Sequence, residues 1–351
     1  PSPGHTTFQA PRVFCSSNCV YNLLFSLHSS FSLTHTLSPD RGVKVMSSLA
    51  EATAIFWALV GPWMFLLNAF SYLPPTILRL FREGDYAALT TPSRVQDAWF
   101  SAFWAWLGPN IRVGRSDMMV ALLEGRVTDG KVVEEPVHPP VSGVVLEIGP
   151  GSGMWVDIFA KGRDGDEKKK AADAAAGMAR GGVRRRVAEG VTRVYGIEPN
   201  TEAHPALRKN VQAAGLEGTY EIVPTGIESL SDPTAWNGKI EKGSVDCIVS
   251  ILCLCSIPEP EKNIAELYSY LKKGGRWYLY EHVEVMQSRP IRLYQRIVNL
   301  VWPRALNGCQ LCRNTGNNLR SAGPWTNIDI RQPHDETWFQ VVPHIFGTFT
   351  K

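Results

Sequence analysis

The sequence predicts an α/β protein with a mainly parallel sheet, helices on both faces of the sheet, and an apolar helical segment ahead of it. Three observations predict this fold class. Strand-like apolar segments alternate with amphipathic segments in the C-terminal half, a glycine-rich turn follows the first of these strands, and a long uncharged run lies near the N-terminus. The chain has 351 residues, of which 44% are hydrophobic and 20% charged, as is typical of a globular protein with a sizeable core.

The first segment, residues 1–45, differs in composition from the rest of the chain. It is rich in serine, threonine and proline and has no sustained helical or strand period. Met46 is the first methionine and precedes a well-organised segment, so we expect a disordered or non-native leader and a native start at Met46. The alternative is a signal peptide, although Ser26, His28 and two further serines interrupt its apolar run.

Three further regions follow this leader. We expect an apolar membrane-anchor segment at residues 46–83, a helical cap or linker at residues 84–140, and a catalytic α/β domain at residues 141–351. A charged stretch at residues 161–190 is predicted to be an exposed, partly helical insertion in that domain. Its three consecutive arginines, beginning at Arg184, could contact anionic lipid, or the stretch is a solvated loop.

The anchor is predicted from an uncharged run at residues 52–78. At 1.5 Å per residue, a helix over this run is long enough to cross a hydrocarbon core of about 30 Å and to contact membrane lipid. Arg79 and Arg82 follow the run, so for a spanning helix the positive-inside rule places the C-terminal part of the chain in the cytosol. Pro62 within the run leaves an in-plane anchor open, and a buried core helix is the third alternative.

An aromatic-rich segment, DAWFSAFWAWLGP, follows at residues 97–109. It is too short to span a bilayer. It could lie on the membrane, cover an apolar pocket as a lid, or form a core helix, and the sequence leaves these three alternatives open.

A glycine-rich turn opens the α/β domain. Residues 142–148 (SGVVLEI) are typical of a strand, Gly149, Gly151 and Gly153 alternate after it, and the next segment (MWVDIFAKG) is predicted to start a helix. Glycines permit positive φ and a close approach of the backbone to a ligand. Loop amides and a helix N-terminus favour a phosphate or carboxylate, so this unit predicts a Rossmann-like nucleotide-binding fold.

The spacing of the glycines separates two ligand classes. Nicotinamide dinucleotide sites have GxGxxG, whereas this chain has ExGxGxG with Glu147 ahead of the glycines. A second acid, Glu198, ends the next predicted strand, where a carboxylate can accept both ribose hydroxyls of an adenosine. The ExGxGxG spacing resembles motif I of class I S-adenosylmethionine-dependent methyltransferases, in which the loop holds the methionine part of the cofactor.

The rest of the domain continues the alternation of helices and strands. The expected elements are a helix at 204–216, a third strand and turn at 220–230, a buried fourth strand at 243–257, an amphipathic helix ending at Gly274-Gly275, and a fifth strand at 276–283.

Several stretches together resemble one family of membrane-anchored enzymes. The longest, residues 243–283, contains the fourth and fifth strands, and the segments GIEPN, LNGCQLCR and VVPHIFGTFTK add to it. With the apolar anchor, they resemble the methyltransferase-like protein 7 family over roughly residues 46–351. The resemblance implies a Rossmann-like class I methyltransferase fold with a mainly parallel seven-stranded sheet, and S-adenosyl-L-methionine as cofactor. It also implies a location at the endoplasmic reticulum or lipid droplets, with the catalytic domain facing the cytosol.

The resemblance further implies which residues bind the cofactor. Gly226, Ile227 and Glu228 fall where the family surrounds the adenine. The full set expected at the cofactor is Glu147, Gly149, Pro150, Gly151, Gly153, Glu198, Pro199, Asn200, Gly226, Ile227, Glu228, Leu252 and Cys253. The chain departs from the family pattern at Glu198, where an aspartate is common, and at Pro150, which interrupts the glycine loop.

Members of this family are associated with methyl transfer to alkyl thiols, which implies S-methylation of a small, lipophilic acceptor by in-line displacement. The enzyme must align the acceptor with the departing sulfur, and a thiol, with a pKa of about 8.5, must lose its proton. His282, after the fifth strand, is the candidate base or substrate contact, with a structural role as the alternative. Cys253 and Cys255 are expected to be buried free thiols at the end of the fourth strand.

Two other functions stay open: N-, O- or C-methyl transfer to a lipid or apolar metabolite, and cofactor binding without catalysis. No metal is expected, because Cys309 and Cys312 have CxxC spacing but no second pair or suitable histidine nearby in the sequence. No nucleic acid partner is expected either, since the net charge is only +3 and no basic, aromatic-interleaved element is present. The sequence contains no signal for an oligomeric state.

Overall fold

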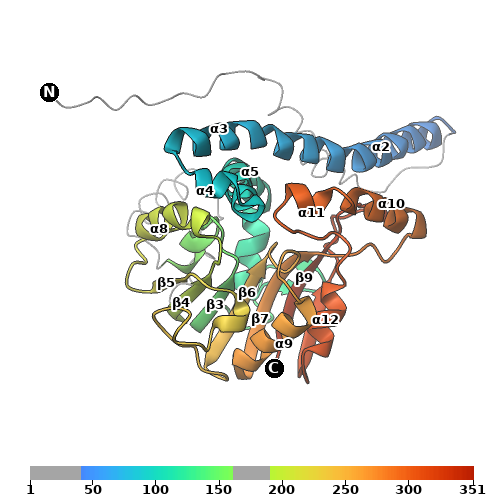
Figure 1. Ribbon diagram of the computed structural model, residues 1–351. Helices are drawn as coiled ribbons and strands as arrows, with labels where there is room; N and C mark the ends of the chain where they lie inside the picture. Colours follow the sequence, from blue (N-terminus) through green and yellow to red (C-terminus); the bar gives the residue numbers. More distant parts are fainter. Residues whose placement is uncertain (1–40, 161–189) are drawn as a thin grey trace, which may run out of the picture. The chain divides into compact units, whose positions relative to one another are not determined.

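The computed structural model describes residues 41–160 and 190–351, with side chains from residue 49 onward (Figure 1). Most of the expected leader and nearly all of the charged insertion, including its arginines, therefore lie outside the described residues. The chain divides into two compact units, Pro1–Gly61 and Pro62–Lys351. The sheet and the candidate site lie within the second unit.

A seven-stranded sheet forms the centre of the second unit (Figure 1). Its strands are ordered β5-β4-β3-β6-β7-β9-β8. Their bounds are β3 Gly143–Ile148, β4 Val191–Ile197, β5 Tyr220–Val223, β6 Val245–Ile251, β7 Leu271–His282, β8 Asn327–Arg331 and β9 His344–Thr350. The first five strands in this order pair in parallel, whereas β9 is antiparallel to both β7 and β8. The predicted mainly parallel sheet is confirmed.

Alternation along β7 shows that helices cover both faces of the sheet. Trp277 and Leu279 belong to a core cluster that also contains residues of α9 (Pro260–Tyr270) and α12 (Thr315–Ser321). Tyr280 points to the opposite face, where the guanidinium of Arg115 lies 5.8 Å from its ring centroid. Arg115 belongs to α5 (Pro92–Leu123), so this helix covers the second face.

The apolar segment near the N-terminus forms two consecutive helices, α2 (Arg41–Ser71) and α3 (Leu73–Glu83). Pro74 and Pro75 stand in the first turn of α3, where a missing N–H is tolerated, and Gly84 ends the helix in the left-handed conformation. In the described part of the chain, the stretch Leu49–Glu83 is long and apolar enough to cross a membrane by length and composition. The short helix α4 (Tyr86–Leu89) follows, capped by Asp85.

The last ten residues of α2 pack within the second unit. Leu66 and Ala69 are buried, and the ring of Phe65 stacks on Trp302 at 5.2 Å between centroids. The indole N–H of Trp99 donates to the carbonyl of Ala69 at 2.7 Å. This C-terminal part of α2 therefore belongs to the folded domain.

The aromatic segment at residues 97–109 lies inside α5, a helix of 32 residues. Trp99, Phe103 and Leu107 are buried at helical spacing. Of the three alternatives, the core helix is the one observed. A two-stranded hairpin, β1 (Val127–Thr128) and β2 (Lys131–Val132), follows it.

Several expected elements differ from those observed. The helix expected after the glycine loop is, in the described residues, a run of turns and a 3₁₀ helix, η1 (Val156–Phe159), because Arg112 binds the Met154 carbonyl and the Asp157 carboxylate. The helix expected to reach Gly274-Gly275 ends at Tyr270, since Leu271 already pairs with Val245 in the sheet.

The fourth strand, β6, ends at Ile251, earlier than expected. Leu252 takes a φ of 57°, which no strand residue adopts, and its N–H donates to the carbonyl of Tyr280 at 2.9 Å. Cys253 and Cys255 therefore lie in the loop beyond β6. This change matters for the site, because the loop can turn both side chains away from the sheet.

Candidate functional site

The glycine loop joins β3 to the turns before η1 and has positive φ at each of its glycines, as expected. Gly149 has a φ of 62°, and a Cβ there would come 2.7 Å from the Cβ of Cys253. Gly151 has a φ of 57°, but the nearest atoms to a Cβ there belong to Trp104, at 3.6 Å. Gly149 is thus required by protein packing, whereas Gly151 presents a backbone with room beside it for a ligand.

Pro150 fits into the loop without interrupting it. Its carbonyl accepts from the N–H of Gly153 at 2.9 Å, which closes a turn, and the proline ring is buried. Proline has no N–H to satisfy. The loop therefore keeps the shape that its glycines dictate.

Glu198 directly follows β4 and is hydrogen-bonded to the glycine loop. One carboxylate oxygen accepts from the N–H of Gly151 at 2.8 Å, and the other accepts from the N–H of Asn200 at 2.9 Å. Burial raises the pKa of Glu198, and these two hydrogen bonds oppose the rise. The expected ribose-binding acid and the expected methionine-binding loop are thus in direct contact, an arrangement that fits an adenosyl ligand with a charged amino-acid end.

Glu147 lies in β3 beneath the loop and is buried. Its carboxylate accepts from the hydroxyl of Tyr220 at 2.6 Å. Burial raises the pKa of Glu147 to about 7, against the lowering effect of the Tyr220 hydrogen bond. Its observed contact therefore fixes β3 to a side chain of β5.

The residues expected around the adenine follow β5, the outermost parallel strand. Gly226 precedes a 3₁₀ helix, η3 (Ile227–Ser229), in which Ile227 is buried. The Glu228 carboxylate turns back toward Gly226, 2.3 Å from where a Cβ would stand. Because β5 pairs with β4 in parallel, this turn lies at the same edge of the sheet as Glu198.

Helix α5 contributes residues to this edge that the sequence did not identify. Trp104 is the side chain nearest to Gly151, and Phe100 stacks on it at 5.5 Å between centroids. The hydroxyl of Ser101 accepts from the Asn200 side chain at 3.1 Å. The aromatic pair at i and i+4 was the available signal, but the sequence could not show that this helix lies against the loop.

Glu281 organises the loop after β6. Its carboxylate is fully buried and accepts from the N–H of Cys253 at 3.0 Å and from the N–H of Leu254 at 3.1 Å. Burial raises the pKa of Glu281 to about 7, although these N–H groups lower it. Cys253, which contacts Gly149, is therefore held by the strand that carries His282.

His282 is the last residue of β7 and is buried. Its Nε2 lies 3.1 Å from the Sγ of Cys309, and among the described residues its Nδ1 has no hydrogen-bond partner. The Sγ of Cys309 lies 3.3 Å from the Sγ of Cys255. The structure thus joins Cys309 to Cys255 and His282, a grouping that the CxxC spacing with Cys312 did not predict.

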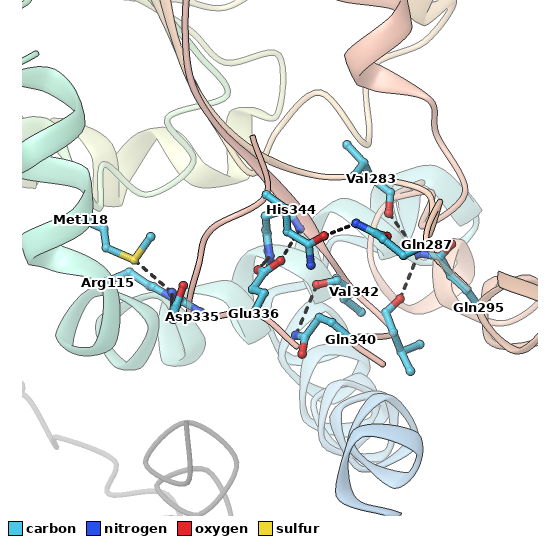
Figure 2. Close-up of polar contacts among 12 residues, drawn as sticks. Arg115, Met118, Val283, Gln287, Gln295, Asp335, Glu336, Gln340, Val342 and His344 are labelled. Carbon is cyan, nitrogen blue, oxygen red and sulfur yellow. Dashed lines mark hydrogen bonds and ion pairs between the residues drawn. The ribbon is translucent and has the colours of Figure 1, made fainter. Parts of the chain in front are cut away.

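A polar cluster next to His282 fixes the start of β9 (Figure 2). His344 pairs with His282 across the two strands, and the carboxylate of Glu336 accepts from the N–H of His344 at 2.9 Å. Arg115 donates to Asp335 at 2.9 Å, as Figure 2 shows. Burial lowers the pKa of His344, which keeps its ring neutral where it stacks on Tyr280.

All of the expected site residues come from loops or strand ends at the carboxyl edge of the parallel sheet. The loop after β3 supplies the glycines, the loop after β4 the acid, the loop after β5 the adenine set, the loop after β6 Cys253, and the end of β7 His282. This is the edge at which open α/β sheets bind ligands. Five cysteines in the described part of the chain are free, and Cys253 and Cys255 are buried, as expected.

Comparison with known proteins identifies a family. The family model described as a methyltransferase domain matches residues 130–322. Human thiol S-methyltransferase TMT1B is 32% identical over 164 residues, which are 45% of this chain and 62% of that protein. Human thiol S-methyltransferase TMT1A is 30% identical over 161 residues, again 45% and 62%.

The chain thus aligns with less than two thirds of the length of the curated relatives that it matches. Among solved structures, the N-methyltransferase NodS from Bradyrhizobium japonicum WM9, in complex with S-adenosyl-L-homocysteine, aligns at a TM-score of 0.40 and 12% identity. The alignment covers 68% of this chain and 85% of that chain.

Proposed function

Because the chain belongs to the methyltransferase-domain family, with S-adenosylmethionine as its cofactor, we propose that it transfers a methyl group from this cofactor to a small, lipophilic acceptor. The observation that carries the proposal is the contact between Glu198 and Gly151 at the carboxyl edge of the sheet. This contact places a carboxylate that can bind the ribose of the cofactor next to loop backbone that can bind the amino-acid end of the cofactor. When bound, S-adenosylmethionine supplies an electrophilic methyl group on a sulfonium sulfur.

The cofactor-binding residues divide the ligand between them. Gly149, Pro150, Gly151 and Gly153 would hold its amino-acid end, and Glu198, with Pro199 and Asn200, would hold the ribose. Gly226, Ile227 and Glu228 would surround the adenine, and Leu252 and Cys253 would close the site from the loop after β6. Glu147 supports this arrangement from below through Tyr220.

We propose an alkyl thiol as the acceptor. One feature supports this choice: the relatives at about 30% identity are thiol S-methyltransferases. A thiolate is a strong nucleophile once it is ionised, so methyl transfer to it depends mainly on alignment and on loss of one proton.

His282 is the residue proposed to contact the acceptor or take its proton. Its Nε2 is engaged with Cys309, which leaves Nδ1 as the unpaired ring atom. We expect replacement of His282 by alanine to lower turnover about 100-fold or more, as for other lost acid–base groups, with cofactor affinity unchanged. Turnover and calorimetric cofactor affinity would be measured on the same preparation, and unchanged turnover would remove His282 from the reaction.

We also propose that the protein sits on a membrane through an anchor that lies in the membrane plane. Leu66 and Ala69 pack into the domain, and the indole N–H of Trp63 donates to the hydroxyl of Tyr294 at 2.7 Å. A helix fixed on one face by its own domain cannot be surrounded by lipid along that part. Leu67 on its outer face and Phe81 on α3 are exposed and suit contact with lipid.

Helix α10 (Arg289–Asn299) extends this apolar surface. Its inner face is fixed by the buried side chain of Gln295, which donates to the carbonyls of Val283 and Val341 at 3.1 and 2.9 Å (Figure 2 shows the first of these contacts). Its outer face exposes Leu293, Ile297 and, just past the helix end, Leu300. Apolar side chains with flanking arginines are typical of helices that lie at the surface of a bilayer.

The membrane proposed is that of the endoplasmic reticulum or of lipid droplets, with the catalytic domain on the cytosolic side. A lipophilic acceptor would partition into that membrane and reach the site from it. Fluorescent fusion proteins, imaged with markers of both compartments, would test the location, and a uniformly diffuse signal would contradict it.

An acceptor screen tests the reaction. The full chain would be incubated with S-adenosylmethionine and matched alkyl thiol, alkyl amine and phenol acceptors, and S-adenosylhomocysteine would be quantified. We expect turnover with the thiol at least about 10-fold above the others. If the amine or the phenol is methylated faster than the thiol, the proposed thiol acceptor is wrong and the preferred compound indicates the acceptor class.

A non-catalytic binding protein predicts a different result in the same screen. It would bind S-adenosylmethionine in calorimetry but release no S-adenosylhomocysteine with any acceptor class. A chain that bound no cofactor at millimolar concentration would contradict the methyltransferase proposal as a whole.

A further inference from the structure

Three soft or borderline metal ligands meet beyond the carboxyl ends of β6 and β7. Cys255 comes from the loop after β6, His282 ends β7, and Cys309 lies in the loop after α11 (Trp302–Ala305). Their Sγ and ring nitrogen atoms all lie within 4.8 Å of one another. The two sulfurs are 3.3 Å apart, and the histidine Nε2 is 3.1 Å from the Cys309 sulfur.

The three side chains of this grouping are largely buried. Cys255, His282 and Cys309 are 2%, 6% and 8% exposed. Buried thiols usually pack among apolar neighbours, but these two face each other and an imidazole. The arrangement brings polar donor atoms to one point in the protein interior.

We propose that Cys255, His282 and Cys309 bind one soft divalent cation, with Zn²⁺ the best match. Two thiolates and one imidazole are ligands that zinc prefers, and two thiolates balance its charge. Tetrahedral zinc with bonds of about 2.3 Å to sulfur separates two thiolates by about 3.8 Å. The observed sulfur separation of 3.3 Å would widen by about half an ångström on binding.

The loops that carry the two cysteines are tied together before any cation binds. The N–H of Gln310 donates to the carbonyl of Cys255 at 3.0 Å, and Arg313 donates to the carbonyl of Leu254 at 3.1 Å. The indole N–H of Trp302 donates to the Cys309 sulfur at 3.3 Å, as outer groups commonly do to metal-bound thiolates. The ligands are therefore positioned by contacts that do not require the metal.

Three protein ligands leave a tetrahedral cation one open position, which is typical of catalytic zinc. Resting on the proposed function, we infer that the acceptor thiol takes this position. Cys253, two residues before Cys255, contacts the glycine loop at Gly149, so the cluster adjoins the cofactor site. With Nε2 bound to the cation, His282 would act as a ligand that places the acceptor, and Nδ1 would carry the proton of the ring.

The step balances without a further reactant. The acceptor thiol binds the cation through sulfur and releases its proton to water, since the cation lowers the pKa of a bound thiol. A sulfur lone pair then forms the new S–CH₃ bond while the bond between the methyl group and the sulfonium sulfur breaks. The products are a neutral thioether, which binds zinc weakly and leaves, and S-adenosylhomocysteine.

Metal analysis of the untagged full chain tests the site. The protein would be produced in zinc-supplemented medium and purified with a reducing agent and no chelator, and its metal content measured by mass spectrometry. We expect about one zinc per chain in the wild type and below about 0.1 in Cys255→Ser and Cys309→Ser. Replacement of zinc by Co²⁺ should give the thiolate-to-cobalt charge-transfer absorption of a tetrahedral site.

Two matched controls separate this site from other thiols. Cys247→Ser removes a buried cysteine from β6, the strand that precedes the Cys255 loop, and should keep the metal. Cys312→Ser removes the other cysteine of the CxxC spacing and should also keep it. Loss of metal from Cys312→Ser but not from Cys255→Ser would overturn the proposal. The proposal would also be overturned if wild-type protein, after a chelator has removed its metal, takes up neither Zn²⁺ nor Co²⁺. This test does not depend on whether any variant folds.

The metal site and the proposed function can be disproved independently of each other. If wild-type protein binds zinc but methylates no thiol at any zinc content, the methyl acceptor is wrong and the metal site stands. If thiol methylation proceeds equally in zinc-free and zinc-loaded protein, the function stands and thiol activation by the cation is overturned. We expect thiol methylation to fall about 100-fold in zinc-free protein and to return with added Zn²⁺, with calorimetric affinity for S-adenosylmethionine unchanged.

Discussion

At the scale of single residues, the proposed cofactor site centres on the backbone of Gly151 and the carboxylate of Glu198. Their hydrogen bond of 2.8 Å links the loop after β3 to the end of β4. Gly151 needs its glycine for a φ of 57°, and no protein atom lies closer than 3.6 Å to a Cβ there. If Gly151 faces the cofactor as proposed, a side chain at this position should interfere with the ligand more than with the fold.

Gly151→Ala tests this separation. A residue with a side chain in the left-handed region costs roughly 1–2 kcal/mol. We expect a stability loss of that size and a loss of affinity for S-adenosylmethionine of about 10-fold or more, because the new methyl group occupies the ligand side of the loop. Urea unfolding and isothermal calorimetry measure the two effects.

Gly215→Ala is the matched control. Gly215 has a φ of 69°, and no atom lies within 4 Å of a Cβ there. It should lose the same stability as Gly151→Ala but keep its cofactor affinity. Equal affinities in the two variants would show that Gly151 does not face the cofactor.

Glu147 gives the protein a pH-dependent stability. Its pKa rises from 4.5 to about 7 on folding, because burial disfavours the ionised form. The folded state thus holds a proton that the unfolded state releases, and its stability falls as the pH rises from about 4.5 through 7. Relative to Glu147→Gln, which does not titrate, the wild type should lose roughly 3 kcal/mol between about pH 5 and pH 8.

Urea unfolding of both proteins at each pH measures this loss. Other titrating groups are common to the two proteins and cancel in the difference. A difference that stays constant with pH would mean that the Glu147 carboxyl group is solvated in the folded protein.

At the scale of single elements, α10 has one face that packs into the domain and an opposite face that exposes apolar side chains. Gln295 satisfies backbone groups of the segments beside it, which fixes the inner face in the domain. Leu293, Ile297 and Leu300 lie on the other side and are 63%, 48% and 67% exposed. The helix is therefore rigidly placed while its apolar outer surface stays available to lipid.

We expect the triple variant Leu293→Ser, Ile297→Ser, Leu300→Ser to bind phospholipid vesicles at least about 10-fold more weakly than the wild type. Each aliphatic side chain contributes roughly 1.5–3 kcal/mol when it is fully buried in apolar surroundings, and partial insertion supplies a fraction of this. Co-flotation with vesicles that contain phosphatidylcholine and phosphatidylserine measures the binding.

The matched control replaces three exposed valines outside α10, Val113, Val132 and Val137, by serine. It removes a similar number of exposed aliphatic side chains, so it should bind vesicles like the wild type. Equal weakening in both triple variants would show that α10 has no special part in membrane binding.

At the scale of the whole molecule, α2 is divided between two units. Residues from Pro62 onward belong to the unit that contains the sheet, where Phe65 stacks on Trp302 and contacts Phe103 edge to face. The C-terminal part of this apolar helix is thus a component of the domain core. Its apolar side chains pack into the domain on one side of the helix and are exposed on the other.

Truncation should reveal this division. A chain that begins at residue 62 is expected to unfold within a few degrees of the full chain. A chain that begins at residue 84 exposes Trp99, Phe103 and Trp302, and should lose several kcal/mol at roughly 1.5–3 kcal/mol for each large side chain. Thermal unfolding followed by circular dichroism compares them, and equal midpoints for the two truncated chains would contradict the packing role of α2 and α3.

Much of the fold could be predicted because its signals are local. The glycines of the loop demanded positive φ, and Gly149 and Gly151 have it. Apolar runs of strand length predicted a buried parallel sheet, and five such runs became its parallel strands. The acid expected at the end of the second of these strands, Glu198, lies at the loop, because parallel strands bring their carboxyl ends to one edge.

The sequence by itself determined the α/β fold, the cofactor class and the position of the cofactor loop, since backbone preference and hydrophobic period act between near neighbours. The tertiary structure alone decided which distant residues meet. It placed Trp104 beside Gly151, packed the C-terminal part of the apolar helix α2 into the domain, and joined Cys255, His282 and Cys309 at one point. These three residues are 27 and 54 positions apart, and only strand order and loop path, which no local pattern encodes, could bring them together.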